Sequence, residues 1–233
     1  MKKNIFTKGL LFFGGLFIAG SVAVSSPVYA DKSIKKPGVY EPVLEERDFN
    51  TKQTTKNAFA KNKISFQTML GYLSSSACDI GPSTPNLEYI SINLRLGKMI
   101  NSPSKPKLFP RGNLEALIEL SCSGICNGFG NYFVGSTFLL RYNIVQPDWK
   151  IIPYAQVGVG VVYTDAYKDS SQNAIGQSIE FTPQVSLGAR YLINKKLSID
   201  AEFMFHHISN AGLDERNVGI NSFGGLIGFT RNF

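Results

Sequence analysis

The sequence predicts an all-β protein, an eight-stranded antiparallel transmembrane β-barrel. Three observations predict this fold. Long segments alternate between apolar and polar residues, these segments are even in number, and no run after residue 30 has the ~18 apolar residues of a membrane helix. Strands that face lipid on one side and a polar interior on the other have this two-residue period. Closure removes the unpaired strand edges that a bilayer does not tolerate.

The chain begins with a segment typical of a secretory signal peptide. Lys2, Lys3 and Lys8 precede an apolar run at 9–24, and small residues follow it up to Ala30. We predict that residues 1–30 are a signal peptide cleaved after Ala30. An uncleaved anchor is the alternative, but the apolar run is short for a spanning helix.

The charge of the chain indicates which classes of partner it favours. Without the three lysines of the signal peptide, the formal net charge falls from +7 to +4. This modest excess favours contact with anionic lipid phosphates, and no basic stripe interleaved with aromatic residues indicates a nucleic-acid partner. Residues 31–62 are polar, charged and without a period, so we expect a flexible periplasmic N-terminal segment there.

The alternating segments follow from residue 63, and the predicted barrel spans 63–233. The clearest is 179–193, where Ile179, Phe181 and Val185 share a face opposite Glu180 and Gln184. The full set comprises 63–73, 86–100, 111–122, 128–143, 149–161, 179–193, 197–205 and 219–233. A soluble lipocalin-like barrel is the alternative, with its apolar face turned inward. The last segment alternates down to Phe233, which is typical of the final strand of outer-membrane barrels.

Connection lengths predict an orientation. If the N-terminus is periplasmic, the first strand runs outward, and long outer loops with shorter inner turns are expected. The outer loops are then 74–85, 123–127, 164–178 and 206–218, and the inner turns are 101–110, 144–148 and 194–196.

The three cysteines are Cys78, Cys122 and Cys126, all expected on the outer side. Export to an oxidising compartment allows disulfides, and the odd count leaves one thiol over. Cys122 and Cys126 are predicted near one short loop, where a disulfide and two free thiols are both compatible with the spacing. We predict no metal site, because there is no CxxC motif and both histidines lie elsewhere.

A candidate catalytic pair lies near the end of the chain, at His207 and Ser209. Residues two apart share a face of a strand, with Cα atoms roughly 6.5–7 Å apart. An imidazole can then take a proton from the hydroxyl, as serine-type catalysis requires. Both residues continue the odd series of Phe203 and Phe205, so we expect them on the lipid-facing exterior. His206 has the opposite parity and is expected to be a structural residue facing the lumen or the loop interior. On its own, the stretch also fits a polar turn that ends a strand.

The stretch from His207 to Gly212, with Asn217, Gly219 and Asn221 after it, resembles the signature of the PagL-like lipid A 3-O-deacylases. The resemblance is specific over residues 205–233. In the residues before 205 it extends only to the arrangement of the strands. It implies an outer-membrane barrel with Ser209 as the nucleophile and His207 as the general base. It also implies an oxyanion site at the N–H groups of Ala211 and Gly212, with Asn210 holding the turn.

One position departs from the family pattern. In its best-known form a glutamate twelve places after the serine orients the histidine, and here that position is Asn221. An amide oxygen can orient an imidazole, but it cannot stabilise the imidazolium by charge.

The resemblance therefore implies an esterase of the Gram-negative outer membrane that hydrolyses an ester-linked acyl chain, the 3-O chain, of lipid A in lipopolysaccharide, without a cofactor. The alternative is a non-catalytic eight-stranded barrel with an adhesive, structural or lipid-binding role, or a degenerate esterase, which Asn221 favours. A channel is disfavoured, because side chains fill an eight-stranded barrel.

Overall fold

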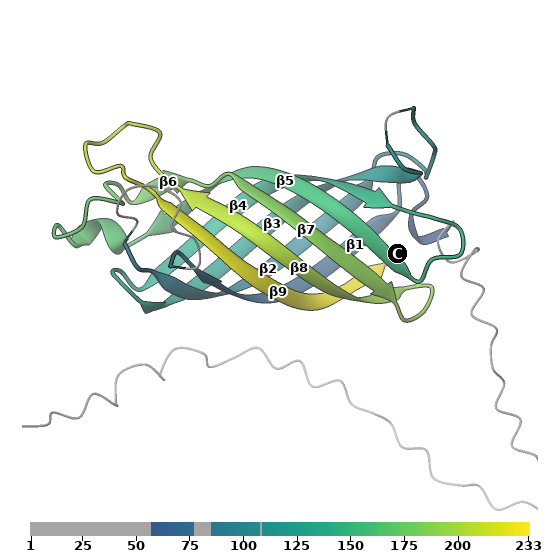
Figure 1. Cartoon of the computed structure of the whole chain (residues 1–233), viewed down its shortest axis with the longest axis horizontal. Helices are drawn as coiled ribbons and strands as arrows, with labels where there is room; N and C mark the ends of the chain where they lie inside the picture. The colour runs from purple at the N-terminus through teal and green to yellow at the C-terminus, as the bar shows by residue number, and fades with distance from the viewer. Residues whose placement is uncertain (1–56, 77–84, 108) are drawn as a thin grey trace, which may run out of the picture. The chain divides into compact units, whose positions relative to one another are not determined.

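The computed structural model describes residues 57–76, 85–107 and 109–233, which form one antiparallel sheet closed into a barrel (Figure 1). The strands are β1 (Ile64–Ser74), β2 (Glu88–Met99), β3 (Gly112–Asn127), β4 (Tyr132–Ile144), β5 (Ile151–Thr164), β6 (Ile179–Phe181), β7 (Gln184–Leu192), β8 (Leu197–Ile208) and β9 (Ile220–Asn232), with one short 3-10 helix, η1 (Ala166–Lys168). The predicted signal peptide, most of the predicted N-terminal segment and Cys78 lie outside the described residues. No helix within the described ranges is long and apolar enough to span a bilayer.

The prediction of an eight-stranded antiparallel barrel is confirmed. Sequential strands pair around the sheet, and β1 pairs with β9 to close it. One predicted strand, 179–193, is interrupted at Thr182 and Pro183 and appears as β6 and β7. Proline has no N–H to give to the ladder. The register is nevertheless continuous, because β5 pairs Val161 with Phe181 and Gly158 with Gln184. Nine segments therefore occupy eight positions in the barrel.

The two faces of the strands follow the predicted parity. On β8, Ile199 and Phe203 are exposed, whereas Asp200 and Glu202 are buried in the lumen. The lumen is filled by paired charges, and Arg95 contacts Glu119 at 2.6 Å and Glu202 at 2.7 Å. Burial of charges requires such pairing. The middle of the barrel is thus a packed polar core enclosed by an apolar outer belt.

Several strands extend beyond their predicted ends, and β3 and β8 reach furthest into the predicted loops. β8 continues to Ile208, so His206 and His207 belong to the strand and not to the loop predicted at 206–218. β3 continues to Asn127, and the predicted outer loop at 123–127 is wrong. A short turn at 128–131 follows, with positive φ at Gly128 and Gly130, a conformation that glycine adopts without a Cβ penalty.

The extension of β3 changes the interpretation of the cysteines. Cys122 and Cys126 both lie on the strand, and both are exposed free thiols. Four residues along a strand span about 13 Å, whereas a disulfide needs Cα atoms within about 7 Å. These two cysteines do not pair with each other in this fold.

The two ends of the barrel differ. The turn end comprises the described parts of 100–111, 145–150 and 193–196, together with the strand ends beside them. The loop end comprises the described parts of 75–87, 128–131, 165–178 and 209–219. In Figure 1 the loop end lies on the left and the turn end on the right. Ala58 and Phe59, which the sequence assigned to the polar N-terminal segment, are buried at the turn end. They pack with Met99 and Val145, and the Asn113 side chain donates to the Phe59 carbonyl at 3.1 Å. This part of the segment departs from the expectation of a flexible chain.

Candidate active site

The pairing of β8 with β9 places His207 directly opposite Asn221. Ser209 lies two residues beyond His207, just past the end of β8, and two backbone hydrogen bonds to Phe181 hold its main chain. The Ser209 N–H donates to the Phe181 carbonyl at 3.1 Å, and the Phe181 N–H donates to the Ser209 carbonyl at 2.8 Å. The His207 N–H donates to the Pro183 carbonyl at 3.0 Å. The interrupted strand thus fixes the backbone of both residues from one side, and pairing with β9 holds His207 from the other.

The His207 imidazole lies between two hydrogen-bonding partners. Its Nε2 atom is 2.8 Å from the Ser209 Oγ, and its Nδ1 atom is 2.6 Å from the Asn221 Oδ1. An amide oxygen only accepts, so this contact requires the proton on Nδ1. The Nε2 lone pair is then directed at the serine hydroxyl, in the tautomer that a general base needs.

The three residues are half-buried and belong to the exterior face of the barrel. Just below them, the Phe205 and Phe223 rings lie with centroids 4.9 Å apart, and the Phe203 and Phe223 centroids are 6.0 Å apart. This aromatic patch, Phe203, Phe205 and Phe223, continues into the apolar outer belt. The site therefore opens toward the surface that lipid would cover, as the odd parity predicted.

The turn after Ser209 is organised by Asn210, which is buried. Its N–H donates to the Asn217 Oδ1 at 2.8 Å, its Nδ2 donates to the Arg216 carbonyl at 3.1 Å, and its Oδ1 accepts the Gly212 N–H at 2.9 Å. Ala211 and Gly212 both have positive φ. The Gly212 N–H, a predicted oxyanion donor, is thus bonded to Asn210, whereas within the described chain the Ala211 N–H has no partner.

Gly219 borders the imidazole from the β9 side. A Cβ at this position would lie 3.1 Å from the His207 Cε1 and 3.4 Å from the Ser209 Cβ, and the backbone φ is +75°. Any side chain would press on the ring and strain the backbone. Asn217 therefore holds the turn, Gly219 leaves room for the His207 imidazole, and Asn221 bonds that imidazole.

A clamp between two loops supports the turn, and the sequence did not predict it. Arg216 donates to the Asp169 carbonyl at 3.0 Å and to the Tyr167 carbonyl at 2.9 Å. In the facing loop, the Gln172 side chain bonds the backbone of Ala174 and Ile175. No local sequence signal indicates the Arg216 contacts, because they join residues more than forty positions apart.

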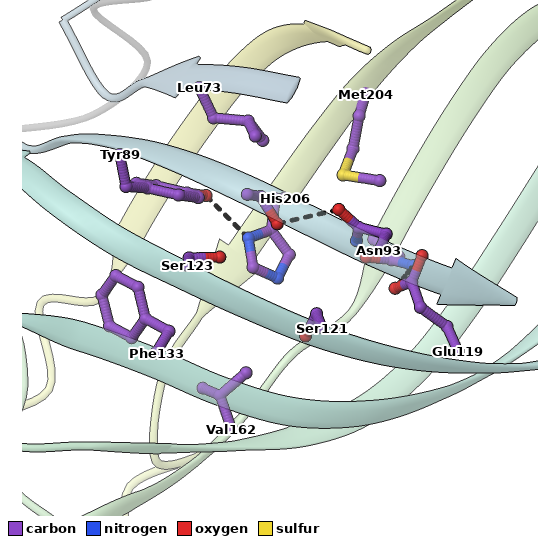
Figure 2. Close-up of a pocket in the computed structure, with 12 residues that line it drawn as sticks. Leu73, Tyr89, Asn93, Glu119, Ser121, Ser123, Phe133, Val162, Met204 and His206 are labelled. Atoms are coloured by element: carbon purple, nitrogen blue, oxygen red, sulfur yellow. Dashed lines mark hydrogen bonds between the residues drawn. The ribbon is translucent and has the colours of Figure 1, made fainter. Parts of the chain in front are cut away.

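His206 faces the lumen, as its parity predicts (Figure 2). Its Nδ1 atom is 2.7 Å from the Tyr89 hydroxyl, and its Nε2 atom contacts the Thr182 hydroxyl. Together with Ser123, Phe133 and other residues it lines a cavity of about 10 Å³, close to the size needed for one water. Among the described residues, no group of three or more His, Cys, Asp or Glu side chains is arranged to hold a metal ion.

Comparisons with known proteins support the resemblance at the level of the family. A profile of the family described as lipid A 3-O-deacylase (PagL) matches residues 109–230, more than half of the chain. No curated protein sequence matches. The solved structures that resemble the chain include the outer-membrane enzyme PagL, at 18% identity and a TM-score of 0.48 over 70% of this chain and 97% of that one. They also include OprG from Pseudomonas aeruginosa (12% identity, TM-score 0.44, 76% and 98% covered) and Neisserial surface protein A (12%, 0.47, 73% and 94%). The chain belongs to the lipid A 3-O-deacylase (PagL) family.

Proposed function

We propose that this protein is an outer-membrane esterase that hydrolyses an ester-linked acyl chain of lipid A, the 3-O chain that the family name specifies. One observation carries the proposal. A single imidazole bonds a serine hydroxyl through Nε2 and an amide oxygen through Nδ1, on the lipid-facing side of a barrel. Family membership supports the choice of substrate and the outer membrane as its location.

The proposed mechanism has two halves. Ser209 attacks the ester carbonyl while His207 takes its proton on Nε2, and the imidazolium returns this proton to the leaving alcohol. The product of this half is an acyl-serine. His207 then takes a proton from water, the water attacks the acyl-serine, and the fatty acid leaves as Ser209 regains its proton. Neither half uses a metal or a cofactor.

The oxyanion needs a fixed donor near Ser209. We assign this role to the Ala211 N–H, because the Gly212 N–H is bonded to Asn210. Asn210 is a positioning residue, since its buried side chain spans the turn and holds Ala211 in its positive-φ conformation.

The acyl chain is proposed to lie along the exterior of β7, β8 and β9. At the lower edge of the aromatic patch, Gly225 lies opposite Phe203, and a Cβ added at Gly225 would meet only open space. Ala189 and Ala201 are paired further down the same face. These small residues leave a shallow strip between larger ones, which is suited to a single extended hydrocarbon chain.

Asn221 stands where the best-known form of the family has a glutamate. It orients the imidazole but carries no charge, so the imidazolium formed during attack is less stabilised than beside a carboxylate. The same observation favours a second candidate, a barrel of this family that binds lipid A without turnover.

The deciding experiment is mass spectrometry of lipid A after incubation with the refolded protein, with lipid A binding measured in parallel. Loss of one acyl chain and release of a hydroxy fatty acid are expected for the wild type, and neither for Ser209→Ala. Ser171→Ala, an exposed serine in a neighbouring loop, is the matched control. Binding without any loss of acyl chains in the wild type would reject the esterase in favour of the second candidate.

A further inference from the structure

The turn end of the barrel carries a ring of basic side chains directly beside the apolar belt. On β2, Lys98 shares the exterior face with Leu96, and on β9 Arg231 shares it with Phe229. Two residues along a strand separate Cα atoms by roughly 6.5–7 Å. These charges therefore begin where the surface that would contact hydrocarbon ends. Lys195 and Lys196 continue the ring in the exposed turn between β7 and β8.

Aromatic side chains accompany these charges. Trp149 and Tyr191 are exposed at the same end, and the Arg231 guanidinium lies 5.3 Å from the centroid of the Phe233 ring. Aromatic rings next to lysine and arginine are typical of the depth at which a membrane protein meets lipid headgroups. The arrangement therefore marks a headgroup zone and not a surface in free solution.

The side chains of the basic ring have no acidic partner among the residues that the structure describes. In the described part of the chain, Lys98, Lys195, Lys196 and Arg231 form no ion pair with a carboxylate. Asp148 is the sole acidic residue in the described positions of the three turns at this end. The loop end has the opposite balance: loops 165–178 and 209–219 contain Asp165, Asp169, Asp214 and Glu215 against Lys168 and Arg216.

We propose that the turn end binds the phosphate headgroups of anionic phospholipids in the leaflet that it faces. Lys98 and Arg231 lie on the lipid-facing surface, which favours a headgroup over an anionic cell-wall polymer approaching from the aqueous side. Each basic residue near an anionic surface changes the affinity by about fivefold. This interaction is separate from the ester chemistry, since Lys196 and Arg231 lie at the opposite ends of β8 and β9 from His207 and Asn221. Lys98 lies near the same end, because it pairs with Ile64, whose carbonyl accepts the Phe233 N–H.

The test compares the wild type with the fourfold variant Lys98→Gln, Lys195→Gln, Lys196→Gln, Arg231→Gln. Lys168→Gln, at the loop end, is the control. Each protein is refolded into vesicles of phosphatidylcholine alone or mixed with phosphatidylglycerol, and extraction in mild detergent followed by native mass spectrometry gives the lipids retained. The wild type should retain phosphatidylglycerol in preference to phosphatidylcholine, and high salt should weaken this preference. Each charge removed should lower the preference by up to about fivefold, and Lys168→Gln should behave like the wild type.

Equal retention of the two lipids by the wild type, or an unchanged preference in the fourfold variant, would overturn the proposal. Heat-modifiable gel mobility in detergent verifies folding. If the fourfold variant fails to fold, Lys98→Gln and Lys196→Gln singly must each lower the preference. Cosedimentation with purified peptidoglycan tests the competing partner. If the wild type binds peptidoglycan, the fourfold variant does not, and neither protein prefers either lipid, the lipid headgroup is rejected as the ligand.

Discussion

His206 and His207 are neighbours in β8, and each imidazole contacts two side chains, yet they serve opposite faces of the barrel wall. His206 lies in the lumen between the hydroxyls of Tyr89 and Thr182, beside a cavity of about 10 Å³. His207 lies on the outer face between Ser209 and Asn221, above exposed aromatic and aliphatic side chains. Both rings contact a hydroxyl group.

The difference shows that access decides which histidine can take part in catalysis on a lipid. An acyl chain cannot enter a cavity of that size, whereas the outer site opens onto the surface that lipid would cover. The same contact between a ring nitrogen and a hydroxyl group is thus a structural link on one face and a candidate nucleophile with its base on the other.

Removing the outer pair should have the largest effect. Ser209→Ala and His207→Ala should each lower the rate of lipid A deacylation by at least about a thousandfold, and the double variant should lose little more, because the two residues act as a unit. The release of hydroxy fatty acid measures the rate, and heat-modifiable mobility verifies the barrel. Full activity in Ser209→Ala would exclude the serine mechanism.

Changing Asn221 should have the next largest effect. Asn221→Ala removes the acceptor for the Nδ1 proton and should slow hydrolysis by about tenfold, which corresponds to roughly 1.4 kcal/mol of barrier. Asn221→Glu should keep or raise the wild-type rate, because a carboxylate stabilises the imidazolium. Lipid A binding, measured separately, should change little in both variants. An unaffected rate in Asn221→Ala would remove this residue from the site.

Releasing the loop clamp should have a smaller effect. Arg216→Ala removes the bonds to the Asp169 and Tyr167 carbonyls and should lower the rate by about three- to tenfold, because the turn that carries Asn210 and Ala211 loses part of its restraint. Limited proteolysis should cleave loops 165–178 and 209–219 faster in this variant. Lys168→Ala, in the same loop region, is the control. Equal proteolysis of Arg216→Ala and the wild type would mean that the clamp does not restrain the loops.

Removing the inner histidine should leave the rate almost unchanged. His206→Ala should alter hydrolysis by less than about threefold, because this ring contacts neither Ser209 nor the outer face. It should lower the free energy of unfolding by about 1–3 kcal/mol, since the buried Tyr89 hydroxyl loses its partner. Urea unfolding from vesicles measures this stability. A loss of activity as large as that of His207→Ala would contradict the separation of the two faces.

Local patterns predicted much of this molecule. The two-residue period of 197–205 placed apolar side chains outside and the charged Asp200 and Glu202 inside. Carrying the odd parity forward, through this segment and 219–233, put His207, Ser209 and Asn221 on the same surface. That inference works because the side-chain direction in a strand depends only on position along the chain. Phe181 and Pro183 were assigned to one strand for the same reason, and only the missing N–H of proline interrupted it.

The remaining features depend on contacts between distant segments. The burial of Ala58 and Phe59, the extension of β3 through Cys126 and the Arg216 clamp all depend on hydrogen bonds or packing that no local period encodes. Alternation therefore determined which face each side chain occupies. Only the folded chain decided which loop groups bond one another, because those contacts depend on which segments the closed barrel brings together.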